Sequence, residues 1–143
     1  LLVNGAGASA GFSVQGAANN QSALDDSGAP NDLTDYTYAT AASQKDSLAI
    51  ADTVAGVTVP AGYSIDAVIW AAWAAKTNTG VASTLQMGGR SSGGTENIGA
   101  AQALTTAFGP VYERQVLDPD SAVWSEALVD SSQLVLQSAG SYS

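Results

Sequence analysis

The chain has 143 residues, which fits one domain, and we expect residues 1–143 to fold as a single unit. Its formal net charge is −9 with only four Lys and Arg residues, which argues against binding by phosphate neutralisation, so we expect no nucleic-acid partner. The chain has no His and no Cys, which excludes Ser-His-Asp and Cys-His catalysis, disulfides and thiolate-bound metals. No apolar run approaches the length of a membrane span, so no membrane partner is expected.

Short apolar runs alternate with clusters of Gly, Pro, Asn, Asp and Ser, and this spacing predicts an all-β fold. The expected strands cover residues 10–15, 35–40, 46–51, 65–76, 83–87, 97–104, 111–117 and 133–137. Eight strands suit two packed sheets, so we expect a jelly-roll β-sandwich. One short helix is expected over 124–130, with Ser121 as a candidate cap.

Three segments between the strands are expected to be loops or turns. Residues 19–34 are polar and acidic, and within them Asn20-Gln21-Ser22 is an acceptor sequence for N-glycosylation. Residues 59–62 read Val-Pro-Ala-Gly, which predicts a turn, and the Gly-rich residues 88–94 predict a hairpin connection.

The expected strand over 65–76 is apolar on both of its faces. Trp70 and Trp73 have opposite parity, so a strand directs them to opposite sides. We expect a central strand with one tryptophan in the core and the other in a subunit contact or beneath another segment of the chain. Trp70 and Trp73 are therefore the candidate interface residues, and we expect a homo-oligomer.

Acidic residues are the remaining candidates for chemistry. Glu96, Glu113 and Glu126 could form a glycosidase-type carboxylate pair, but none lies in a motif. Asp118-Pro119-Asp120 resembles part of a calcium loop without its glycine and distal glutamate, and a turn is the better interpretation. The acids of the 25–35 segment, namely Asp25, Asp26, Asp32 and Asp35, are interpreted as a solvated loop. We therefore predict no catalytic residue, no cofactor and no metal site.

The order of several short motifs resembles a family of jelly-roll virion structural proteins from tailed bacteriophages. The motifs are Asn4-Gly5-Ala6-Gly7, Asp35-Tyr36-Thr37-Tyr38, the 45–52 segment, the 65–76 strand, the 85–90 and 94–96 segments, the 103–108 segment, and Asp118-Pro119 followed by Trp124-Ser125. The chain departs from the family pattern at Ala122, where relatives have Gly, and in the 65–76 strand, which is often rich in Arg in relatives. The resemblance implies a structural role on the head or tail and no catalytic residues.

These observations predict a structural protein of a bacteriophage virion that is a head decoration, fibre or tail subunit located on the extracellular particle surface. Its expected partners are other virion proteins and copies of itself. The alternative is a carbohydrate-binding or adhesive module of an extracellular filament that binds host-surface glycans. The aromatic residues of such a site would come from the set Tyr36, Tyr38, Tyr63, Trp70, Trp73, Tyr112 and Trp124. Exposure of an aromatic cleft would favour the alternative, and burial of the tryptophans between subunits would favour assembly.

Overall fold

A computed structural model describes residues 3–24, 34–50 and 59–141 and shows an all-β protein with one short helix. The strands are β1 (Val3–Ala10), β2 (Ser13–Gln15), β3 (Tyr36–Tyr38), β4 (Lys45–Ile50), β5 (Val68–Ala74), β6 (Ser83–Arg90), β7 (Glu96–Ile98), β8 (Gln102–Ala103), β9 (Gly109–Gln115) and β10 (Gln133–Gly140). The helix α1 covers Glu126–Ser131. The predicted fold class is therefore confirmed, and the jelly-roll connectivity remains an expectation that this strand order does not establish.

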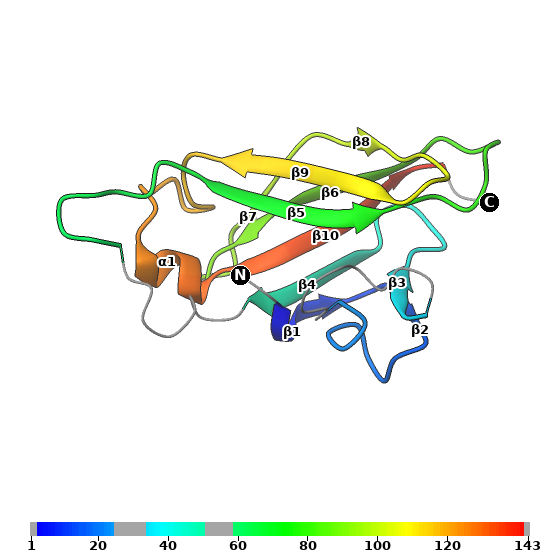
Figure 1. Cartoon of the computed structure of the whole chain (residues 1–143), viewed down its shortest axis with the longest axis horizontal. Coiled ribbons are helices and arrows are strands. Elements are labelled where there is room, and N and C mark those ends of the chain that lie inside the picture. Colours follow the sequence, from blue (N-terminus) through cyan, green and yellow to red (C-terminus); the bar gives the residue numbers. More distant parts are fainter. Residues whose placement is uncertain (1–2, 25–33, 51–58, 142–143) are drawn as a thin grey trace.

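The strands form two layers (Figure 1). The larger layer is a six-stranded antiparallel sheet in the order β1-β4-β10-β6-β7, with β8 also paired to β6. Two antiparallel pairs, β5–β9 and β2–β3, are the other sheets of the described chain. In Figure 1 β5 and β9 run along the same side of β10 and β6, while β2 and β3 lie beyond β4 and β1. The β5–β9 pair therefore covers the large sheet, and its two strands are far apart in the sequence.

The core lies between the large sheet and the β5–β9 pair. Alternation along β4, β6 and β10 directs Leu48, Leu85, Leu134 and Leu136 to the same side of the sheet, where they are buried. From the facing side, the β5–β9 pair contributes Trp70 and Val111, α1 contributes Val129, and the segment before α1 contributes Trp124. This core is built from few large residues.

A buried aspartate anchors the segment after β1. Asp46 of β4 is fully buried and accepts a hydrogen bond from the backbone N–H of Phe12 at 3.0 Å. Its other oxygen accepts from the side-chain amide of Asn20, which also donates to the carbonyl of Phe12 at 3.0 Å. The side-chain amide of Asn20, the first residue of the formal glycosylation acceptor sequence, is therefore engaged inside the fold.

Several predicted strand boundaries are wrong, and close packing of small residues explains two of them. Strand β1 was not expected, because Gly, Ala and Ser give it little strand propensity, yet it pairs with β4 through an irregular ladder. Strand β6 continues through Gly88 and Gly89 to Arg90, where a loop was expected. A Cβ at Gly88 would collide with the backbone carbonyl of Asn97 on β7, so glycine is required for this close approach.

The helix is shorter than expected and has a different cap. It begins at Glu126, and Ser125 is the N-cap, accepting a hydrogen bond from the backbone N–H of Leu128. Ser121, the expected cap, instead occupies a left-handed conformation (φ 68°) in the turn that follows Asp118. Within the described residues no helix has the length and apolar character needed to cross a membrane.

Candidate functional site

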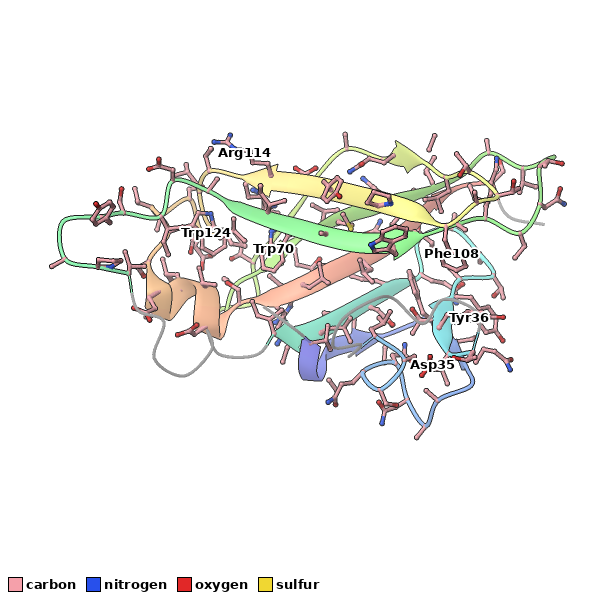
Figure 2. The ribbon with its side chains drawn as sticks, viewed as in Figure 1. Asp35, Tyr36, Trp70, Phe108, Arg114 and Trp124 are labelled. Carbon is pink, nitrogen blue, oxygen red and sulfur yellow. The ribbon has the colours of Figure 1, made fainter. Side chains whose placement is uncertain are left out.

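Strand β5 separates its two tryptophans as parity predicted. Trp70 is 4% exposed and packs edge-on against Trp124, with ring centroids 6.4 Å apart. Trp73 is 53% exposed on the other face. Figure 2 shows Trp70 and Trp124 on the side of β5 that faces β10, and Arg114 of β9 on the opposite side. The expectation of a central strand is wrong for the described chain, where β5 pairs only with β9.

Trp70 is held in place by a buried glutamine. The Trp70 Nε1–H donates to Oε1 of Gln115 at 2.7 Å, and Nε2 of Gln115 donates to the carbonyl of Asn97 on β7 at 2.5 Å. The indole N–H of Trp124 donates to the backbone carbonyl of Gln115 at 2.9 Å. These bonds satisfy the polar atoms that burial of the aromatic rings would otherwise leave without partners. They fix the inner face of β5–β9 to the large sheet, so the opposite face is presented in a defined orientation.

The outward-facing side of this pair is a continuous, mostly apolar surface, which we call the outer face of β5–β9. The strand register places Trp73 opposite Pro110, Ala71 opposite Tyr112 and Ile69 opposite Arg114. Exposure is 63% for Ile69 and 57% for Tyr112, and the other residues of the face are also exposed. Directly opposed residues in a sheet contact each other, so the six side chains form one patch. Large exposed apolar patches mark interaction surfaces.

The charge on this face differs from that of the rest of the chain. None of its six residues is acidic, although the chain has thirteen acids. Lys45 and Arg90 both contact Glu96 on the outer side of the large sheet, and Lys76 donates to the carbonyl of Val81 at 2.6 Å. Arg114 has no such partner among the described residues. The outer face therefore carries a single unpaired positive charge at one end.

A second candidate site is a cleft of about 1250 Å³ beside β5, and its lining includes Ile69, Ala71 and Trp73 of the outer face. Leucine and isoleucine side chains of the large sheet, including Leu48, Ile50 and Leu134, contribute to its lining. Tyr36 and Tyr38 of β3 and Phe108 line it as well, and the two tyrosine rings lie 6.1 Å apart. Figure 2 shows Asp35, Tyr36 and Phe108 at the same end of the molecule. The cleft combines aromatic and apolar walls with a small number of polar groups, as ligand pockets commonly do.

The candidate catalytic glutamates are on different elements. Glu96 lies on β7 and bridges Lys45 and Arg90, Glu113 lies on β9 against Gly99, and Glu126 lies in the first turn of α1. None of the three lines the cleft, where Asp35 is the one acidic residue among those described. The structure therefore shows no paired carboxylates at this cleft.

The Asp118–Asp120 segment is a turn, as interpreted from the sequence. The buried Asp118 carboxylate accepts from the backbone N–H of Ala122 at 2.6 Å. Hydrogen bonds from the side chains of Thr95 and Ser91 hold the pKa of exposed Asp120 below its ordinary value of 3.8. Among the described residues no three acids converge as a metal site would require. Asp25, Asp26 and Asp32 lie outside the described residues.

Comparison of the chain with protein-family models, curated proteins and solved structures finds no match. Sequence reasoning singled out Trp73 and Tyr112 but missed Pro110 and Arg114 as their neighbours. The alternation of Pro110, Tyr112 and Arg114 was a visible signal, but the register that joins them to β5 cannot be read from either strand alone.

Proposed function

We propose that the protein is a non-catalytic structural subunit of a bacteriophage virion, with a jelly-roll fold, that is attached at the particle surface through the outer face of β5–β9. The observation that carries this proposal is the exposure of Trp73, Ile69 and Tyr112 on one flat, acid-free surface. A sheet face of this composition is stabilised when another protein covers it. The motif order that resembles virion structural proteins supports the location on a phage particle.

Attachment through this face should depend on apolar contacts more than on charge. The face offers Arg114 as its one charged group, so few ion pairs can form across it. Exposed ion pairs contribute little and are screened by salt, whereas buried aromatic side chains dominate interface energies. The partner surface should therefore be apolar.

The test is co-sedimentation of tagged subunits with particles of the phage that encodes the chain. The wild-type subunit should sediment with the particles and remain bound in molar salt, and Trp73→Ser should stay in the supernatant. Tyr63→Ser is the matched control, because Tyr63 is 77% exposed in the loop before β5 and is not part of the outer face. Release of the wild-type subunit by salt, or full binding of Trp73→Ser, would contradict the proposal.

A carbohydrate-binding module is the second candidate, and the cleft beside β5 favours it. Tyr36, Tyr38 and Phe108 provide aromatic surface on which sugar rings can stack. Calorimetric titration with host polysaccharides distinguishes this candidate, because Tyr36→Ala should abolish the heat of binding, while Tyr112→Ser, which changes the outer face but not the lining of the cleft, should leave it unchanged. Absence of binding to any host polysaccharide would remove this candidate.

A further inference from the structure

We propose that the partner covering the outer face of β5–β9 is a second copy of this chain, itself held on the particle through another surface, and that the two copies pack face to face about a two-fold axis that runs parallel to the strands. The inference rests on the proposed function, because it identifies the partner of the same surface. It follows from the charge of the face and from the sizes of the side chains that the register brings together.

The charges of the outer face and of the whole chain favour a second copy of this chain over a strongly charged partner. A basic partner would find no acid among the six residues of the face, and an acidic one would find only Arg114. Two copies that each carry a net charge of −9 repel over most of their surfaces, and the acid-free face allows them the closest approach. The apolar patch of one copy is a matching surface for that of the other.

Side-chain size then selects one of two symmetric arrangements. The middle row of the face pairs a small residue, Ala71, with a large one, Tyr112. With the two-fold axis parallel to the strands, β5 of one copy lies over β9 of the other, so each Tyr112 ring fills the space over the other copy's Ala71. With the axis perpendicular to the strands, Tyr112 would meet Tyr112 and Ala71 would meet Ala71, leaving a clash beside a gap. Close packing therefore favours the parallel axis.

The same axis also gives favourable contacts at the two residue pairs on either side of the Ala71–Tyr112 pair. Trp73 of each copy covers the flat ring of Pro110 in the other, and Ile69 covers the aliphatic stem of Arg114. The guanidinium group of Arg114 reaches the rim, where it stays hydrated. Aligned packing of two sheets at about −30° tolerates this arrangement with the normal twist of the strands.

The first measurement is sedimentation equilibrium of the complete chain. The wild-type chain should be dimeric at about 100 µM. Trp73→Ser should raise the dissociation constant by about 30-fold or more, as expected for an interface hot spot. Tyr63→Ser should leave it unchanged. Since the outer-face side chains are exposed, the circular dichroism of each variant should match the wild type, and the melting temperatures should match at protein concentrations low enough for the wild type to be monomeric as well.

The decisive measurement mixes two variants that are each monomeric. Ala71→Arg places a charge where the other copy's Tyr112 should pack, and Tyr112→Glu places the opposite charge on the facing position. Each variant alone should fail to dimerise. An equimolar mixture should form a heterodimer, because Arg at 71 then faces Glu at 112 while the native Tyr112–Ala71 contact forms at the reciprocal position.

A wild-type chain that stays monomeric at about 100 µM, or variants that do not recover dimer formation when mixed, would overturn the inference. A monomer that still needs Trp73 to sediment with particles would refute the like-copy partner and leave the virion role standing. If mixing the two variants restores dimer formation but the wild-type chain never binds particles, the dimer is supported and the virion role is refuted.

Discussion

Trp70 and Gln115 lie on neighbouring strands and share a buried hydrogen bond of 2.7 Å, through which the core-facing tryptophan of β5 is linked to the large sheet. The same glutamine donates to the carbonyl of Asn97, so one polar side chain joins β5, β9 and β7. The outer face of β5–β9 depends on this link, because a shift of the pair over the core would also move Trp73.

Substitution Gln115→Leu should destabilise the fold by about 1–3 kcal/mol, because it leaves the buried Trp70 N–H without a partner and removes the hydrogen bond to the Asn97 carbonyl. Urea denaturation followed by tryptophan fluorescence measures the loss. Gln15→Leu is the control, since Gln15 is exposed on β2, and it should change stability by less than about 0.5 kcal/mol. Equal effects of the two variants would show that the buried link contributes nothing.

Substitution Gly89→Ala should cost about 1–3 kcal/mol, because the added Cβ would lie 2.9 Å from Cζ2 of Trp70 and 3.1 Å from Oε1 of Gln115. Gly109→Ala is a matched control with no heavy atom within 4 Å of the added Cβ. Thermal unfolding of both variants checks the prediction. A Gly89→Ala chain as stable as Gly109→Ala would mean that the Trp70 pocket has room that the structure does not show.

Asp120 should contribute to stability in a pH-dependent way. Its folded pKa lies below the ordinary 3.8 because Thr95 and Ser91 donate hydrogen bonds to the carboxylate. Folding therefore favours the ionised form, and the contribution is present above pH 3.8 and is lost as the pH falls through the lowered pKa. Asp120→Asn should melt below the wild type near neutral pH, and the difference should shrink in acid. Thr95→Val should weaken the same pH dependence. A difference in melting temperature between the wild type and Asp120→Asn that stays constant with pH would contradict this prediction.

Chelation should leave the melting temperature unchanged. Asp118 is satisfied by the backbone N–H of Ala122, which is the behaviour of a turn and not of an unoccupied cation site. Melting curves with EDTA and with added calcium test this expectation. A fall of several degrees in EDTA that calcium reverses would identify a structural ion.

The opposite orientations of Trp70 and Trp73 could be predicted from the sequence because parity along a strand depends on local geometry alone. The Gln115 link could not be predicted, since it joins residues 45 positions apart through a register that no single strand encodes. Strand β1 was missed for a different reason. Its side chains are nearly all small, so large apolar and polar residues do not alternate along it. Its ladder with β4 is made by backbone groups whose partners depend on the tertiary fold.

The outer face has one feature that could be predicted from a single strand and one that could not. The sequence showed that one of Trp70 and Trp73 points away from the core, and the structure identifies Trp73 as that residue. The pairing of Ala71 with Tyr112, which sets the symmetry of the proposed dimer, became visible only with the β5–β9 register.

The position of β10 has a consequence for how the protein acquires its fold. This strand lies between β4 and β6, although it is the last strand along the described chain. Until residues 133–140 have been synthesised, β4 and β6 have no strand to join them, and the leucines on their inner faces lack the packing contacts of Leu134 and Leu136. The large sheet must therefore close after synthesis of β10, through contacts between distant parts of the sequence, which is a slow route to the native state. During that interval the nascent chain exposes open strand edges, and a chaperone that shields them would raise the yield of the folded protein.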